Sequence, residues 1–175
     1  GLAVGVGLRE GLPPLREPVV LKWPNDLLVG DRKLGGILCE ARWMGPEPEI
    51  VVGFGLNVHP IELPPELRGR ATWLRAHTDA PLGRATLLAA LLAALEAAVE
   101  PFLRQGFSAV RERYLAHCVV LGRAVAVGDA TRPGQARRGV AERLDDDGGL
   151  WVRPEGGGPS VRVESADVWL VPPGS

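Results

Sequence analysis

The chain has 175 residues, of which 46% are hydrophobic and 23% are charged, and its formal net charge at pH 7 is −1. This composition is that of an ordinary soluble globular protein with one sizeable core and room for a small second domain, and it excludes long disorder. The near balance of charge excludes a bulk electrostatic field that would attract nucleic acid or a membrane surface.

Two cysteines, Cys39 and Cys118, are too few and too far apart in the sequence to predict a disulfide framework. A reduced cytoplasmic compartment is therefore expected. The sequence shows no secretory start, and we expect no apolar run long enough to span a bilayer.

The first half of the chain predicts an antiparallel sheet. Residues 2–16 leave helix and strand open, because neither periodicity dominates. A strand is predicted over 19–23 and breaks at Pro24, and residues 27–29 and 34–42 then form a hairpin. Residues 49–58 continue as a third strand, which we expect to be buried.

The middle of the chain predicts a loop followed by two helices. Prolines without a period over 59–70 indicate a long surface loop that could act as a lid. The Ala/Leu pattern predicts a helix over 84–105, broken at Pro101 and stopped at Gly106, and a second amphipathic helix over 107–117. We expect these two helices to cover one face of the sheet.

Beyond residue 120 short apolar runs alternate with Gly-rich turns, a texture typical of a small all-β domain. The chain is therefore predicted to divide into 1–119 and 120–175. The fold class is α+β: a mostly antiparallel sheet with helices on one face, followed by a small β-domain. Its strands are expected at 124–127, 139–144, 150–153 and 161–163.

Four residues stand out because the chain otherwise uses their types sparingly. Lys22 and Lys33 are the only lysines among 20 basic residues, and Asn25 and Asn57 are the only asparagines. All four lie between positions 22 and 57. All other members of the Lys and Arg set are arginines. The two lysines, and the two asparagines beside them, are therefore candidates for function.

Three motifs occupy the same segment. They read Lys22-Trp23-Pro24-Asn25-Asp26, then Arg32-Lys33-Leu34-Gly35-Gly36-Ile37-Leu38, then Gly53-Phe54-Gly55-Leu56-Asn57-Val58. In residue type, order and spacing they resemble the biotin protein ligases. The resemblance implies the class II synthetase-like biotin/lipoate ligase fold for 1–119 and a small Src-homology-3-like β-barrel for 120–175.

The activity that the resemblance implies is a two-step acyl transfer in the cytoplasm. Biotin reacts with ATP to give biotinyl-5'-AMP, with Mg²⁺ as the accompanying ion, and the biotinyl group passes to one lysine of the biotin carboxyl carrier protein of acetyl-CoA carboxylase. The family also implies a possible homodimer. No DNA partner is expected, since the sequence has no winged helix, and no membrane partner is expected.

The resemblance assigns catalysis to Lys33. A biotin carboxylate must approach a phosphate that is itself negative, and a compact ammonium group suits the space between them better than a planar guanidinium. Lys22 would add positive charge toward the phosphates. Asp26 would lie in the adenylate site, where it orients Lys33 or helps to hold Mg²⁺, or else it is a turn residue.

The remaining candidate residues have a binding role and a structural alternative. Trp23 either walls the site or packs in the core. Asn25 either contacts the adenylate or forms an Asx-turn. Gly35 and Gly36 either let a strand pass close to the adenylate or mark a β-bulge. Asn57 is expected to be a buried amide that binds an adenine edge or a phosphate oxygen.

The chain also departs from the family pattern. The family's main biotin-binding loop, Gly-Arg-Gly-Arg-x-Gly-Arg, is not found upstream of Lys22, so residue 1 is expected to lie inside the catalytic domain. We therefore do not expect these 175 residues alone to carry full activity. Near the C-terminus Asp167 keeps an acidic position of the family, whereas Val171 stands where the family has Arg.

These departures leave two alternative functions open. The first is a non-catalytic adenylate-binding or regulatory module derived from the family. The second is a lipoate-type ligase, which shares the fold and the adenylation chemistry. The Lys22–Asp26 run and the small C-terminal β-domain favour biotin over lipoate.

Overall fold

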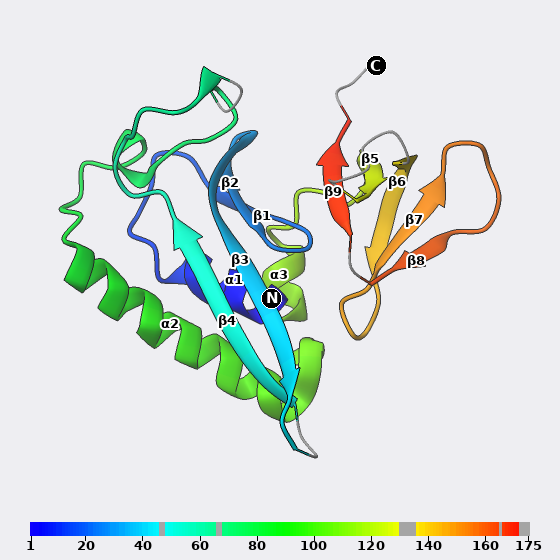
Figure 1. The fold of residues 1–175 in the computed structure, drawn as a ribbon, viewed down its shortest axis with the longest axis horizontal. Helices are drawn as coiled ribbons and strands as arrows, with labels where there is room; N and C mark the ends of the chain where they lie inside the picture. The colour runs from blue at the N-terminus through cyan, green and yellow to red at the C-terminus, as the bar shows by residue number, and fades with distance from the viewer. Residues whose placement is uncertain (46–47, 66–67, 130–135, 165, 172–175) are drawn as a thin grey trace.

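The computed structural model describes residues 1–45, 48–65, 68–129, 136–164 and 166–171. Its first half contains a four-stranded antiparallel sheet with the strands in chain order, here called the first sheet (Figure 1). The predicted antiparallel sheet is confirmed, with one more hairpin than expected, because β1 and β2 pair with each other. The strands are β1 (Val19–Lys22), β2 (Asp26–Val29), β3 (Arg32–Trp43) and β4 (Pro48–Leu56).

A helix that the sequence left undecided, α1 (Leu2–Glu10), packs directly on the first sheet. A Cβ atom on Gly5 would lie 3.6 Å from side-chain atoms of Ile37 and Leu21 in the sheet. Gly7 and Gly11 instead face the backbone of α2 (Arg84–Gln105). The expectation that the later helices cover the sheet directly was wrong, because α1 lies between the sheet and α2.

The long helix α2 runs unbroken through Pro101 and ends before Gly106, whose φ is 70°. The expected break at Pro101 was wrong. A proline removes one backbone N–H from a helix, but the residue lies close to the end of α2 and the helix continues past it. The chain then forms a 3-10 turn, η3 (Gly106–Ala109), and a short helix, α3 (Arg111–Leu115), in place of one helix over 107–117.

The apolar character of α2 also corrects an expectation. The helical segment Arg84–Ala109 is long and apolar enough, by length and composition alone, to cross a membrane. Its apolar stretch is only 17% buried in this structure. One side packs on α1, and Leu88, Leu92 and Leu103 are exposed on the rest of the helix.

The second sheet has five antiparallel strands in the order β8-β7-β6-β5-β9 and lies to the right of the first sheet in Figure 1. Four of the strands were predicted, and β9 was not. Pairing between the two outer strands, β8 and β9, is absent from the described residues. The strands are β5 (Ala124–Gly128), β6 (Arg137–Leu144), β7 (Leu150–Pro154), β8 (Val161–Val163) and β9 (Asp167–Leu170).

One hydrophobic core connects the two sheets. Leu21, Leu27 and Val29 of the first sheet and Leu144 and Leu150 of the second belong to the same cluster of buried side chains. The second sheet is therefore packed against the rest of the molecule, and side chains that it contributes hold a fixed position relative to the first sheet.

Alanine substitutions at two glycines of α1 are expected to have opposite effects on stability. Gly5→Ala should stabilise the fold by about 1 kcal/mol, since alanine is the better helix former and its Cβ meets only ordinary contacts at this position. Gly7→Ala should destabilise it by about 1–3 kcal/mol through overpacking, because the new Cβ would lie 2.8 Å from Cα of Leu95. Urea unfolding measures both changes, and effects of the same sign would contradict the placement of α1.

Candidate functional site

Asp26, at the start of β2, binds both lysines of the chain. Its Oδ2 lies 2.6 Å from Nζ of Lys22, and its Oδ1 lies 2.5 Å from Nζ of Lys33. The side chains of Asp26 and Lys22 are 11% and 18% exposed, whereas that of Lys33 is 49% exposed. One carboxylate thus holds an enclosed ammonium group and a second one that reaches solvent.

A β-bulge brings Lys33 to this face of the sheet. Asp26 lies opposite Gly36 in the pairing of β2 with β3, and two residues later Leu28 lies opposite Lys33, which leaves Leu34 as the extra residue. Side chains alternate between the faces of a strand, so without the bulge Lys33 and Gly36 would lie on opposite faces. The inserted residue therefore aligns Lys33 with Asp26.

Two glycines leave the space that this arrangement needs. A Cβ on Gly36 would lie 3.0 Å from Nζ of Lys33 and 3.5 Å from Oδ1 of Asp26. A Cβ on Gly35 would lie 2.6 Å from the carbonyl oxygen of Gly55 on β4. Gly36 thus leaves room for the ion pair, and Gly35 is required by the close approach of β3 and β4. A β-bulge is present in this segment, but its extra residue is Leu34 and not one of the glycines; the approach of these glycines to an adenylate stays a prediction.

The two ammonium groups decide the protonation of Asp26. Burial of the carboxyl group alone would raise its pKa, but hydrogen bonds from Lys22 and Lys33 outweigh burial, and the pKa of Asp26 lies below its ordinary value. Asp26 is therefore ionised at neutral pH. The group carries one negative charge between two positive charges, which leaves a net positive face.

Asn57 holds the backbone that carries Lys33. Its Nδ2 donates hydrogen bonds to the carbonyl oxygens of Lys33 at 3.2 Å and Thr72 at 2.9 Å. The expected burial of this amide was wrong: Asn57 is exposed, and β4 is exposed along most of its length because it is the outer strand of the sheet. The amide nitrogen is committed to the backbone, so the amide oxygen is the atom that can face a ligand.

Residues 70–72, at the end of the proline-bearing loop, are hydrogen-bonded to the backbone of Lys33 as well. The N–H of Lys33 donates to the carbonyl of Arg70 at 2.9 Å, and the N–H of Thr72 donates to the carbonyl of Lys33 at 2.9 Å. Leu63 and Gly69 of the predicted loop lie at the site together with Arg70. Residues 66 and 67 of this loop lie outside the described residues. The described part of the loop thus borders the site, and its action as a lid stays a prediction.

Trp23 and Asn25 are placed differently from the other candidates. Trp23 is 1% exposed, and its Nε1 donates to the carbonyl of Gly148 in the second sheet at 3.0 Å. Asn25 Nδ2 donates to the carbonyl of Ile37 at 2.9 Å, and the Ile37 N–H donates back to the Asn25 carbonyl at 2.9 Å. Core packing, the structural alternative offered for Trp23, describes what its side chain does here. The side chain of Asn25 is structural as well, but it binds the backbone of β3 and does not form the expected Asx-turn.

A cleft of about 1090 Å³ opens over the Asp26 face, and both sheets line it. Six of the predicted site residues are among its lining, whereas Trp23 and Asn25 are not. The six are Lys22, Asp26, Lys33, Gly35, Gly36 and Asn57. The second sheet contributes four residues of β9 to this lining, Asp167, Val168, Trp169 and Leu170. Arg123, just before β5, and Val171, just after β9, complete its share.

Two basic residues of the cleft escaped the sequence analysis. Arg70 belongs to the stretch Arg68-Gly69-Arg70 at the end of the proline-bearing loop, and it lines the cleft. Arg123 follows Gly122 directly before β5, and no motif marks it. Val171 lies nearby, because its N–H donates to the Ala124 carbonyl at 3.0 Å. The second sheet therefore offers a guanidinium group to the cleft although residue 171 is not an arginine.

The arrangement at Asp26 does not fit a magnesium ligand. Mg²⁺ prefers carboxylate oxygens that are free to coordinate it, usually together with substrate phosphates. Both oxygens of Asp26 are already bound by ammonium groups, which would also repel a divalent cation. Groups of three or more His, Cys, Asp or Glu suited to a metal are absent from the described part of the chain. A metal ion held by Asp26 therefore has no part in the proposed mechanism.

The Asp26 contacts predict a pH-dependent contribution to stability. The folded pKa lies below the unfolded value, so the contribution is fully present above about pH 4 and is lost as the pH falls through the folded pKa. In urea unfolding, Asp26→Asn should therefore be less stable than the wild type by a constant amount between pH 5 and 7, and the difference should shrink below pH 4. A difference that stays constant to pH 2 would contradict the ion pairs.

The chain is similar to known proteins in sequence and in fold. The model of the Biotin/lipoate A/B protein ligase family matches residues 5–57, the segment that contains Lys22, Asp26, Lys33 and Asn57. The biotin protein ligase of Aquifex aeolicus in complex with biotin and ATP superimposes with a TM-score of 0.78 and 26% identity, over 97% of this chain and 69% of that one.

Two curated relatives carry the name biotin–[acetyl-CoA-carboxylase] ligase. The one from Mycobacterium tuberculosis is 33% identical over 171 residues, which are 95% of this chain and 60% of that protein. The one from Paracoccus denitrificans is 30% identical over 183 residues, which are 97% of this chain and 67% of that protein. Sequence and fold agree, and the chain belongs to the biotin/lipoate ligase family.

Proposed function

We propose that the protein is a biotin protein ligase, which activates biotin with ATP to biotinyl-5'-AMP and transfers the biotinyl group to a lysine of a biotin carboxyl carrier protein. The observation that carries the proposal is the pair of ammonium groups held by Asp26 on the floor of the cleft. The names of the curated relatives and the biotin and ATP bound to the Aquifex ligase support the same choice of substrates.

The first step needs a positive charge between two anions. An oxygen of the biotin carboxylate forms a bond to the α-phosphorus of ATP, and the bond from that phosphorus to the bridging oxygen breaks, so that pyrophosphate leaves. Lys33 suits this step because its ammonium group is a point charge on a flexible stem and is the more exposed of the two. Asp26 sets the direction of that ammonium group and keeps it near the floor of the cleft.

Further cations can bind the phosphate oxygens that leave. Lys22 is held by the same carboxylate, and Arg70 and Arg123 border the cleft from the loop and from the second sheet. Guanidinium groups bind phosphate through paired N–H donors. In the second step the amine of the carrier lysine attacks the acyl carbon, the new C–N bond replaces the C–O bond to AMP, and the amine loses a proton.

The alternatives remain distinguishable by experiment. The family model covers lipoate as well as biotin ligases, whereas the curated relatives compared above are named for biotin. The chain spans 60% of the length of the Mycobacterium relative, so the activity, substrates and carrier of the whole protein are part of the proposal. A lipoate-type ligase would support pyrophosphate exchange with lipoate in place of biotin, and a non-catalytic module would support it with neither.

The cellular setting and the form of the second sheet belong to the same proposal. Free thiols at Cys39 and Cys118 and a net charge near zero support a cytoplasmic protein without a DNA or membrane partner, which cell fractionation tests. Five antiparallel strands in the order β8-β7-β6-β5-β9 support a small Src-homology-3-like barrel. An experimental structure in which the outer strands stay apart would overturn that classification.

We also propose that the chain forms a homodimer through β4. This strand is the edge of the first sheet, and its Ile50, Val51 and Val52 are 61%, 47% and 41% exposed. An exposed apolar edge is a template for pairing with a second copy of the same strand. Sedimentation equilibrium should show a dimer that Val52→Lys converts to a monomer, and a wild-type protein that is monomeric at micromolar concentration would contradict this.

The two lysines allow a matched test of the mechanism. In the full protein, Lys33→Arg should reduce biotin-dependent exchange of pyrophosphate into ATP by about 100-fold or more, since the guanidinium cannot take the place of a compact charge between the anions. Lys22→Arg keeps the positive charge at the other partner of Asp26 and should reduce the same exchange rate by less than about tenfold. Circular dichroism checks that both variants fold. Undiminished exchange in Lys33→Arg would contradict the proposed role.

A further inference from the structure

The turn between β6 and β7 makes a buried contact with the Lys22–Asp26 segment. The indole Nε1 of Trp23 donates a hydrogen bond of 3.0 Å to the carbonyl oxygen of Gly148. Trp23 follows Lys22 directly and is 1% exposed, so its indole N–H depends on this one carbonyl in the structure. The turn between β6 and β7 therefore contacts the segment that carries Lys22 and Asp26 through Trp23, which does not line the cleft.

Gly148 fits its position because it has no side chain. Its φ is 92°, a conformation that other residues rarely adopt. A Cβ atom there would lie 2.5 Å from Cδ1 of Leu2 and 3.6 Å from Cγ of Phe107. The turn thus lies against Leu2 of α1 and Phe107 of η3, beside Trp23.

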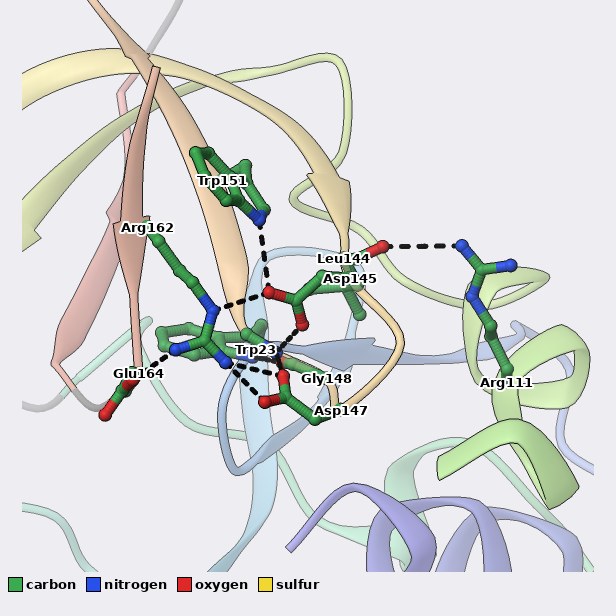
Figure 2. A network of polar contacts seen from close by, with 10 residues as sticks. Trp23, Arg111, Leu144, Asp145, Asp147, Gly148, Trp151, Arg162 and Glu164 are labelled. Atoms are coloured by element: carbon green, nitrogen blue, oxygen red, sulfur yellow. Dashed lines mark hydrogen bonds and ion pairs between the residues drawn. The ribbon is translucent and has the colours of Figure 1, made fainter. Parts of the chain in front are cut away.

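Arg162 of β8 binds two carboxylates of this turn at once, as Figure 2 shows. Its Nε lies 2.6 Å from Oδ2 of Asp145, and its Nη2 lies 2.6 Å and 2.5 Å from the two oxygens of Asp147. A third carboxylate, that of Glu164, pairs with Nη1. A Cβ on Gly149 would lie 2.9 Å from the guanidinium, so this glycine lets Arg162 lie across the turn.

The two aspartates that bind Arg162 also accept hydrogen bonds from the backbone of the turn. The N–H of Gly149 donates to Oδ1 of Asp145 at 2.8 Å and to Oδ1 of Asp147 at 3.1 Å. Trp151 Nε1 donates to Oδ2 of Asp145 at 3.1 Å. A chain of contacts therefore runs from Arg162 through both carboxylates to the peptide unit whose carbonyl receives Trp23 (Figure 2).

We propose that Arg162 and Asp145 are positioning residues for the adenylation site: they fix the Gly148 carbonyl, which holds Trp23 and through it the segment that carries Lys22 and Asp26. Neither residue lines the cleft, so each acts without touching a substrate. The link to adenylation rests on the proposed function, whereas the mechanical link from Arg162 to Trp23 does not. A displacement of about 1 Å at reacting groups can cost 10²-fold in rate, so a loosened turn should be visible in catalysis.

The experiment compares Arg162→Gln with Arg153→Gln in the full protein. Arg153 lies on the neighbouring strand β7 and pairs with Glu142 at 2.8 Å, with its side chain 55% exposed, so it controls for the loss of a surface ion pair in the same sheet. The first readout is hydrogen exchange of the Trp23 indole N–H by ¹⁵N NMR, assigned with Trp23→Phe. We expect exchange about tenfold or more faster in Arg162→Gln and unchanged in Arg153→Gln.

The second readout is biotin-dependent pyrophosphate exchange, normalised to the number of active sites and measured well below the unfolding temperature. Arg162→Gln should lower kcat about tenfold with little change in KM for ATP, because it alters the alignment of charges rather than a substrate contact. A purely structural role would lower only the number of active sites. Both residues act through one hydrogen bond. The double variant Trp23→Phe with Arg162→Gln should therefore reduce kcat by no more than the larger of the two single reductions.

The two readouts separate the inference from the function on which it rests. Unchanged indole exchange in Arg162→Gln would overturn the inference, and so would faster indole exchange with an unchanged kcat. A wild-type protein without pyrophosphate exchange would instead overturn the proposed function, and the indole measurement would still decide the link between Arg162 and Trp23.

Discussion

The site depends on one carboxylate that is shared between two ammonium groups. Two like charges brought together on one sheet face repel each other by an energy on the order of 3 kcal/mol at the effective dielectric of a protein surface. Asp26 offsets this repulsion with two short contacts and leaves one unit of positive charge over. That surplus faces the cleft, where the proposed substrates bring a carboxylate and phosphates. The register of three strands, the bulge and the glycines are all constraints that keep this carboxylate where it is.

Much of the first sheet and most of the cleft residues could be predicted from the sequence. Lys22, Asp26 and Lys33 belong to motifs with a fixed order, and the apolar runs around them mark strands. Their mutual arrangement could not be predicted, because it depends on a one-residue shift in pairing at Leu34, and the two glycines beside it indicated a bulge only as one of two alternatives. Asn57 shows the same limit: apolar neighbours indicated burial, but an edge strand can be apolar and still exposed.

The other features that the sequence did not predict involve residues whose partners are distant in sequence. Trp23 lies in the middle of a functional motif, yet its indole is directed to a carbonyl 125 positions away. Arg123 reaches the cleft only because the second sheet packs beside the first, and α1 was undecided because its glycines, which weaken the helical pattern, are what allow α2 to approach. Local patterns describe elements, whereas these features are set by how elements meet.

The bulge at Leu34 has a consequence for how the family can vary. Lys33 and Gly36 are three residues apart, so a regular ladder of unchanged length would turn the lysine to the face that packs on α1, although every motif letter would remain. Removing one residue at the same time would return the lysine to the face of Asp26. Function at this position is therefore encoded by the number of residues together with the irregular pairing that accommodates it, and a comparison of residue types alone does not record that pairing.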